Sequence, residues 1–318
     1  EKYSIFYSYL LYYYIMANNR KAAIKRLKNL VFTPKSEIGK FRENIEKEFS
    51  SVFLPNRVEH TEETINGVVC DVLTPEVYAS DRVMVYVHGG SFIGGSRKSW
   101  RVFCASLAHA SSTKIIVPEI RLAPEHPFPA ALDDVKLVIK ALYPNEPNII
   151  VAGDASGASI ALSLVLSLKE AARNKIYGIL LFSPWLDFSA EAPIYHDKKL
   201  KDELLSPDAM RRTGNMYTYT SNLTNPHVSP QYMLPNMLEG FPNVYIQMGE
   251  KEIIINETKK FCMLLRSTHV PYTLDIWSDM MHMFQFAEEF LEESHLAIDK
   301  VGKFIKDNGF NRDVFAEG

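Results

Sequence analysis

The feature that most constrains the fold is a regular alternation of strand-like and helix-like segments after residue 65. Runs of β-branched and other apolar residues are typical of buried strands, and helical patterns lie between them. Such alternation predicts an α/β fold, in which helices cover both faces of a mostly parallel sheet. The predicted strands are RVMVYVH (82–88), KIIVPEI (114–120), NIIVAG (148–153), GILLFSP (178–184), NVYIQMG (243–249) and YTLDIW (272–277).

This arrangement places the chemistry at one edge of the sheet. In open α/β sheets ligands bind outside the carboxyl ends of the strands, so functional residues are expected directly after them. Two segments depart from the alternation: residues 1–55 are predicted helical, and residues 187–236 polar and irregular. We expect 1–55 to form a helical cap, to which 187–236 contributes, over a catalytic domain spanning 56–318. The predicted helices are roughly 100–110, 129–142, 156–172, 256–268 and 283–307.

Composition and charge narrow the class of ligand. Apolar residues make up 47% of the chain, enough to form a buried core without stabilising disulfides or metal ions. The formal net charge is −3 and no long basic run occurs, which excludes the electrostatic pattern of a nucleic-acid-binding protein. A small neutral or mildly polar molecule is the expected partner. The cysteines are few and far apart, so we expect reduced thiols in a cytoplasmic protein, with no metal or other cofactor; they are Cys70, Cys104 and Cys262.

An aromatic stretch near the start of the chain, YSIFYSYLLYYYIM (3–16), resembles a membrane segment but is shorter than the ~20 residues that a spanning helix needs. We predict a helix that packs on a hydrophobic site. A truncated anchor and an interfacial membrane helix are the alternatives. Its aromatic side chains favour an apolar ligand with a planar or acyl portion, but they are equally compatible with plain core packing; they include Phe6, Tyr7, Tyr12 and Tyr13.

The first chemical motif is HGGSF (88–92), directly after a predicted strand. Two adjacent glycines let the backbone turn sharply and direct N–H groups into open space, because no Cβ blocks the approach. A motif of this type after the third strand builds the oxyanion hole of lipases and esterases. A structural turn without a catalytic role is the alternative.

The second motif is GDASG (153–157), between a strand and a helix. In a nucleophile elbow, G-x-S-x-G, small residues flank the strained central residue so that strand and helix can pass closely. Gly153 and Gly157 meet this need only if the central residue is Ala155. A motif centred on Ser156 would place branched Asp154 at a flanking site. We therefore expect Ser156 to donate its backbone N–H to the oxyanion rather than to act as the nucleophile.

An acid and a histidine follow the elbow in the order expected for a catalytic triad on an α/β sheet. Glu250 and Glu252 both lie just past the strand 243–249, where an acid would orient a histidine and stabilise its cation. We favour Glu252 over Glu250. His282 follows the last strand, a setting that the other histidines lack, and is the predicted general base.

These motifs together resemble the hormone-sensitive-lipase-like branch of the α/β-hydrolases, which includes many carboxylesterases and arylacetamide-deacetylase-like enzymes. The resemblance covers roughly residues 65–307, and its longest motif is RLAPEHPFPAALDD (121–134). The family's spacing from its acid into the next helix matches the residues after Glu252. The other segments that carry the resemblance are HGGSF (88–92), GDASGA (153–158) and SPWLDF (183–188).

The resemblance implies a role for each matching residue. Glu252 would be the acid and His282 the base, and the oxyanion donors would be Gly89, Gly90 and Ser156. Ser91 stands for the third glycine of the usual H-G-G-G, and Ile120 stands where tyrosine commonly precedes R-L-A-P-E. Ala155 occupies the position of the nucleophilic serine, and its methyl group cannot attack a carbonyl.

Two classes of function follow. In the first, the natural enzyme is a serine carboxylesterase that acts on small or medium apolar esters through an acyl-enzyme, and an engineered Ser-to-Ala change at Ala155 has inactivated it. In the second, the protein is a natural pseudoenzyme that uses the pocket as a small-molecule receptor, as plant gibberellin receptors of this fold do. Retention of Glu252 and His282 favours the first, because a receptor has no chemical need for a base and its orienting acid.

Overall fold

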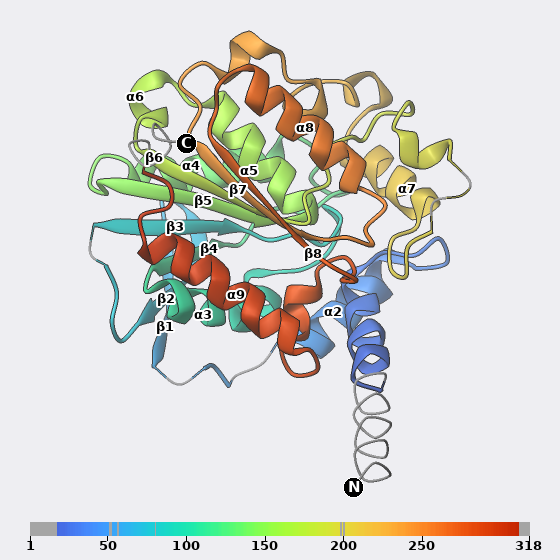
Figure 1. The fold of residues 1–318 in the computed structure, drawn as a ribbon, viewed down its shortest axis with the longest axis horizontal. Helices are drawn as coiled ribbons and strands as arrows, with labels where there is room; N and C mark the ends of the chain where they lie inside the picture. The colour runs from blue at the N-terminus through green and yellow to red at the C-terminus, as the bar shows by residue number, and fades with distance from the viewer. Residues whose placement is uncertain are drawn as a thin grey trace, which may run out of the picture.

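The computed structural model describes residues 18–50, 53–55, 57–79, 81–197, 199 and 201–311. Its centre is an eight-stranded sheet with the order β1-β2-β4-β3-β5-β6-β7-β8 (Figure 1). Strands β3 to β8 are parallel, whereas β2 is antiparallel to both of its neighbours. The strands are β1 (Val58–Ile65), β2 (Val68–Pro75), β3 (Arg82–Val87), β4 (Lys114–Pro118), β5 (Asn148–Asp154), β6 (Ile176–Phe182), β7 (Asn243–Gly249) and β8 (Tyr272–Trp277).

Helices cover both faces of this sheet, as predicted. Helices α3 and α9 lie on one face, and α4, α5 and α8 lie on the other (Figure 1). Residues 18–27 are also helical. The labelled helices are α2 (Ile38–Phe49), α3 (Arg97–Ser111), α4 (Ala130–Leu142), α5 (Ala155–Ser167), α6 (Glu170–Arg173), α7 (Pro207–Tyr217), α8 (Ile255–Ser267) and α9 (Glu292–Lys306).

The last predicted helix, over 283–307, is wrong in its first third. Met283 has a left-handed φ of 54°, the 3₁₀ helix η6 (Phe284–Ala287) follows, and α9 begins only at Glu292. All four side chains of η6 are buried. A long amphipathic helix buries only one stripe, so four consecutive buried positions do not suit it. The predicted helix over 156–172 likewise stops at Ser167, whose hydroxyl donates to the carbonyl of Leu164.

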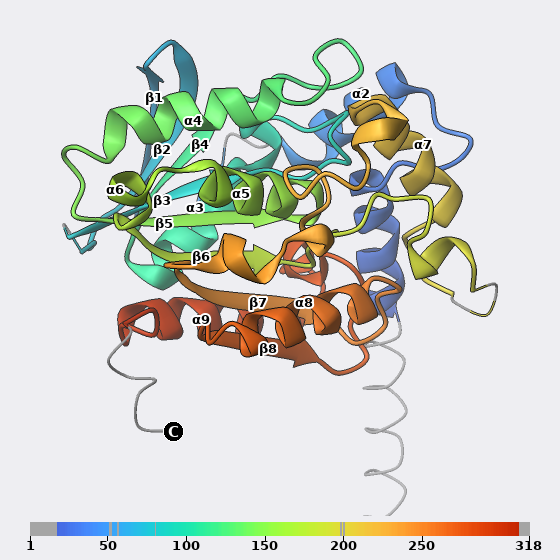
Figure 2. The same cartoon turned by 90° about the horizontal axis from the view of Figure 1, so that it is seen from above.

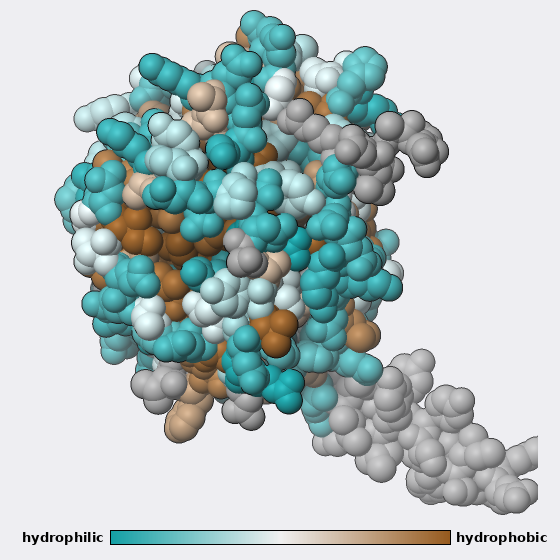
Figure 3. Space-filling model, turned by 90° about the vertical axis from the view of Figure 1, so that its left-hand side faces the viewer, coloured by the Kyte–Doolittle hydropathy of each residue, from teal (hydrophilic) through white to brown (hydrophobic). Residues whose placement is uncertain are grey.

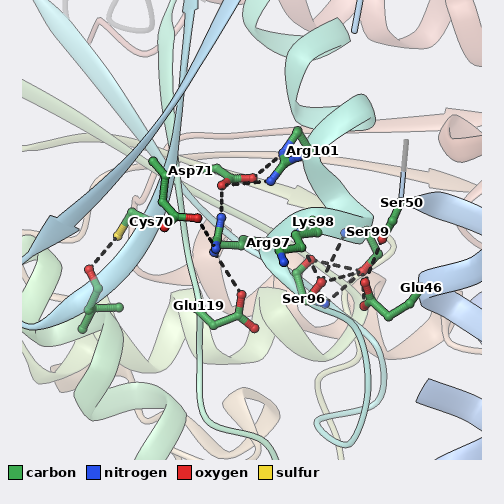
Figure 4. A network of polar contacts seen from close by, with 12 residues as sticks. Glu46, Ser50, Cys70, Asp71, Ser96, Arg97, Lys98, Ser99, Arg101 and Glu119 are labelled. Carbon is green, nitrogen blue, oxygen red and sulfur yellow. Dashed lines mark hydrogen bonds and ion pairs between the residues drawn. The ribbon is translucent and has the colours of Figure 1, made fainter. Parts of the chain in front are cut away.

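The two antiparallel strands at one edge were not among the predicted elements. Most β1 side chains are exposed, so its sequence, VEHTEETI, lacks the apolar run of a buried strand. Buried charges fasten this edge to α3, as Figure 4 shows. Asp71 of β2 accepts hydrogen bonds from Arg97 and Arg101, the latter at 2.6 Å from Nε to Oδ2. Arg97 also lies 3.3 Å from a carboxylate oxygen of Glu119.

Parts of the two segments that depart from the alternation, 1–55 and 187–236, lie at the carboxyl edge of the parallel strands. Figure 2 shows α2 and α7 at that same end of the molecule. Residues 187–236, predicted to be irregular, contain α7 and several 3₁₀ turns: η2 (Pro193–Tyr195), η3 (Thr220–Asn222) and η4 (Pro230–Tyr232), with η5 (Pro235–Leu238) overlapping the end; η1 (Lys28–Leu30) precedes α2.

Figure 3 shows the opposite side of the molecule, where the parallel strands begin. Hydrophilic side chains cover most of it, and hydrophobic ones show through near its centre (Figure 3). Among the described residues, no helix is both long and apolar enough to cross a membrane. The aromatic stretch 3–16 lies outside the described residues, so its predicted helix stays a prediction.

Candidate active site

The elbow between β5 and α5 is centred on Ala155. This residue has a left-handed φ of 46°, the strained conformation expected of the central position. A Cβ at Gly157 would collide with the carbonyl oxygens of Val87 and His88, which explains the need for glycine there. The hydroxyl of Ser156 accepts a hydrogen bond from the backbone N–H of Phe92, at 3.1 Å. That hydroxyl therefore braces a neighbouring loop.

Glu252 and His282 form a buried pair beside this elbow. His282 Nδ1 lies 2.8 Å from Glu252 Oε2, and both residues are less than 5% exposed. The second carboxylate oxygen, Oε1, accepts hydrogen bonds from the N–H of Gly249 at 2.6 Å and from the hydroxyl of Ser183 at 2.7 Å. Glu250, the competing acid, points elsewhere and accepts from the hydroxyl of Ser278 at 3.0 Å.

The hydrogen bond between the pair fixes the state of the imidazole. An ionised carboxylate only accepts hydrogen bonds, so Nδ1 of His282 carries the proton and Nε2 of the neutral ring keeps a free lone pair. Burial acts to lower the pKa of His282, but the hydrogen bond and charge of Glu252 outweigh it, and the net shift is upward. The imidazole is thus arranged to take a proton at Nε2.

The HGGSF loop adopts an unusual backbone over the same pocket. Gly90, Ser91 and Phe92 all have left-handed φ values, of 92°, 58° and 64°. The N–H of Gly89 donates to Asp154 Oδ1 at 3.0 Å, so it is occupied inside the protein. Our expectation that Gly89 supplies an oxyanion donor is therefore revised. Within the described part of the chain, the N–H groups of Gly90 and Ser91 donate to no protein acceptor.

Asp154 is the buried anchor of this loop, and sequence reasoning gave it no role. Besides Gly89, its Oδ1 accepts from the hydroxyl of Tyr86 at 2.9 Å and from the indole N–H of Trp100 at 2.7 Å. Burial raises the pKa of Asp154 to about 7, against the opposing effect of these hydrogen bonds. Asp154 lies within the elbow motif and Ser183 within SPWLDF. Their positions in these motifs are the sequence features that could have indicated their roles.

A small apolar cavity lies over the elbow. It leaves about 20 Å³ for the centres of water-sized molecules. Val31 and Phe32, from the segment before α2, form part of its wall. Leu205, Ala209 and Met210, from the segment around α7, form another part. The remaining lining residues are Ser91, Ala155, Ser156, Trp185, Ile254 and His282.

Polar contacts tie the two halves of this wall together. Arg212 of α7 donates to the carbonyl of Ser36 at 3.1 Å, and its guanidinium lies 5.0 Å from the ring centre of Phe32. Arg42 of α2 donates to the carbonyl of Ile93 at 2.6 Å, next to the HGGSF loop. Segments far apart in the sequence therefore close over one site.

Comparison with known proteins agrees with this geometry. The sequence profile of a family described as alpha/beta hydrolase fold matches residues 84–286. The chain belongs to that family. It is 29% identical over 233 residues to an esterase from Acinetobacter venetianus, and 27% identical over 228 residues to an acetyl-hydrolase from Streptomyces hygroscopicus. Each match covers 71% of this chain and 75% of the relative.

Solved structures place the chain more narrowly within this family. A hormone-sensitive lipase from a metagenome library superposes with a TM-score of 0.79 at 26% identity, covering 86% of this chain and 94% of that one. An esterase of the bacterial hormone-sensitive lipase family gives 0.83 at 24% identity, covering 92% and 98%. The predicted α/β-hydrolase fold and the resemblance to the hormone-sensitive-lipase-like branch are confirmed.

Proposed function

We propose that this site is that of a serine carboxylesterase for small or medium apolar esters, held short of its covalent step by Ala155. The observation that carries the proposal is the buried Glu252–His282 pair, 2.8 Å apart, beside an elbow centred on residue 155. The relatives named esterase and acetyl-hydrolase support the same reaction class.

With serine at position 155 each neighbouring group has a task. His282 Nε2 removes the serine proton as the oxygen attacks the ester carbonyl, and Glu252 stabilises the imidazolium. The carbonyl oxygen, now negative, accepts hydrogen bonds from the N–H groups of Gly90, Ser91 and Ser156. His282 then protonates the leaving alcohol, and water later releases the acyl group by the reverse sequence.

The cavity is too small to hold a substrate, which supports a cap that moves when a substrate binds. Ligand pockets usually measure about 300–1,000 Å³, far more than the ~20 Å³ left above Ala155. We propose that residues 1–55 and 187–236 act as the cap, and that the part formed by Phe32, Leu205 and Met210 moves outward to admit a substrate. Its apolar lining favours an apolar acyl or alcohol group.

The alanine at position 155 is compatible with two functions, and one observation supports each of them. We propose that a serine stands there in the active form, because the base, its acid and the oxyanion loop are all retained. A receptor that binds a small molecule without turnover is the second candidate, and the methyl group of Ala155 itself supports it, since no acyl-enzyme can form.

Ala155→Ser distinguishes these functions. The variant should gain hydrolysis of 4-nitrophenyl acetate or butyrate, by as much as about a millionfold in kcat, because loss of the serine costs that much in subtilisin. Ala155→Ser with Ser156→Ala is the matched control. It should still form the acyl-enzyme, because the backbone N–H of residue 156 is unchanged, and any loss of rate reports the missing hydrogen bond to Phe92. A variant that stays inert across acyl lengths, while the alanine chain binds a non-ester ligand tightly, would favour the receptor.

A further inference from the structure

Ala155 lacks the hydroxyl group that a serine would place in the cavity beside His282. A serine would place a hydroxyl between the elbow and His282, whereas alanine ends at its methyl group. The cavity at this point is lined by Ala155, Ser91, Ser156 and His282, among others, and leaves about 20 Å³ for water centres. A cavity needs about 10–15 Å³ by this measure to hold one water molecule. The cavity that Ala155 and His282 share therefore has room for a single water molecule.

This cavity also has polar partners for a water molecule, which needs two to four of them. Nε2 of His282 is an acceptor, because Nδ1 holds its proton against Glu252. The backbone N–H of Ser91 is a donor without a protein acceptor in the described residues. A water molecule here would be held by hydrogen bonds and oriented towards the base.

We propose that the alanine chain itself hydrolyses reactive esters, by direct attack of a water molecule that His282 deprotonates. This inference rests on the proposed function, because it uses the same base and oxyanion donors. The water oxygen forms a bond to the carbonyl carbon while its proton passes to Nε2 of His282, and the carbonyl electrons move onto the carbonyl oxygen. The bond to the alcohol oxygen then breaks, and the alkoxide leaves with the proton from Nε2; a nitrophenolate leaves without it, and the proton goes to solvent. The products are a carboxylic acid and an alcohol, with no acyl-enzyme.

Residual activity of this kind has a clear competing explanation. In subtilisin, loss of the serine alone costs about as much as loss of the whole triad, so the remaining rate comes from binding and the oxyanion hole. The space at Ala155 predicts a different outcome here, in which the residual rate depends on His282. General-base catalysis typically contributes about 10²–10⁴-fold, so the dependence is measurable.

The test measures steady-state hydrolysis of 4-nitrophenyl acetate by the chain as it stands and by His282→Gln. Binding and the oxyanion donors alone should give on the order of 10³-fold over buffer. We expect the alanine chain to exceed buffer on the order of 10⁵-fold, because His282 adds roughly 10²-fold, and His282→Gln to lose that added factor. His295→Gln is the matched control, since His295 lies on α9 with a side chain 65% exposed, and it should leave the rate unchanged. The rate should rise with pH as His282 loses its proton, with a midpoint above 6.5.

Two further measurements separate this route from others. The alanine chain should show no burst of nitrophenol and should resist an organophosphate that inactivates Ala155→Ser, which excludes a contaminating serine esterase. Equal rates in the alanine chain and His282→Gln would overturn the proposal, as would an acyl group trapped on His282. Those results would leave the proposed function standing if Ala155→Ser is active; an inert Ala155→Ser would overturn the proposed function instead.

Discussion

At the residue scale, the site is defined by how its hydrogen bonds are shared. Glu252 divides its two oxygens, one for His282 and one for Gly249 and Ser183, so the carboxylate is held from both sides. Such partners orient the acid and keep the imidazole in one tautomer. Asp154 does the equivalent for the HGGSF loop, the proposed oxyanion loop, through Gly89. Neither acid needs to touch the substrate to affect the reaction.

Glu252→Gln tests this arrangement in the Ala155→Ser protein. The amide preserves the shape of the side chain but does not stabilise an imidazolium and permits the wrong tautomer. We expect kcat to fall by about 10⁴-fold, as for the corresponding change in a serine protease triad. Glu250→Gln, whose carboxylate lies against Ser278, should leave kcat unchanged. A loss in Glu250→Gln, with none in Glu252→Gln, would reverse the assignment.

At the element scale, the proposed cap combines two segments whose side chains line the cavity above the elbow. Phe32 precedes α2, Met210 belongs to α7, and both line the cavity. Phe32 is also held by Arg212 on one side and by the edge of the Phe41 ring, at 5.3 Å between centroids, on the other. The position of one side chain thus depends on elements from both halves of the proposed cap.

Phe32→Ala tests whether this side chain limits the acyl group, again with serine at position 155. Removing the ring should enlarge the cavity and shift the preference in kcat/KM towards longer acyl esters. The change should also cost about 3–5 kcal/mol of stability, as other buried phenylalanines do. Phe49→Ala removes a buried ring of equal size that packs on Phe286 and does not line this cavity, so it should cost stability without shifting the preference. Equal shifts in both variants would argue against a specific role for Phe32.

At the scale of the whole molecule, buried charges join the antiparallel edge to the rest of the sheet. Burial acts to raise the pKa of Asp71, but hydrogen bonds from Arg101, His60 and Arg97 outweigh it, and the pKa lies below its usual value. The ionised form is therefore favoured in the folded state. Its contribution to stability is present above the unfolded pKa and is lost as the pH falls through the folded one.

Asp71→Ala should destabilise the fold by about 3–5 kcal/mol, because it leaves Arg97 and Arg101 without their shared carboxylate. Urea unfolding at neutral pH measures this loss. Glu62→Gln removes a 58% exposed partner of the same Arg97 and should cost no more than about 1 kcal/mol. Similar losses in the two variants would show that burial of Asp71 is not what matters.

The sequence predicts the features of the site that depend on residues close together in the chain. The elbow, the acid and the histidine each follow a strand with a strong apolar pattern, so their common edge was predictable. The contact between Gly89 and Asp154 joins residues 65 positions apart, and nothing in the HGGSF motif alone indicates it. The buried 3₁₀ turn at Phe284–Ala287 resembles a helix in sequence, and its true form depends on packing beneath the site.

The most direct test of a serine-esterase site at this elbow is covalent trapping in Ala155→Ser. Rapid mixing with 4-nitrophenyl butyrate should give a burst of nitrophenol close to one equivalent where deacylation is slow, and peptide mass spectrometry should place the butyryl group on residue 155. The same experiment on the alanine chain should give neither. A butyryl group on Ser156 would show that the elbow is centred one residue later, and hydrolysis without any acylated residue would contradict the covalent route.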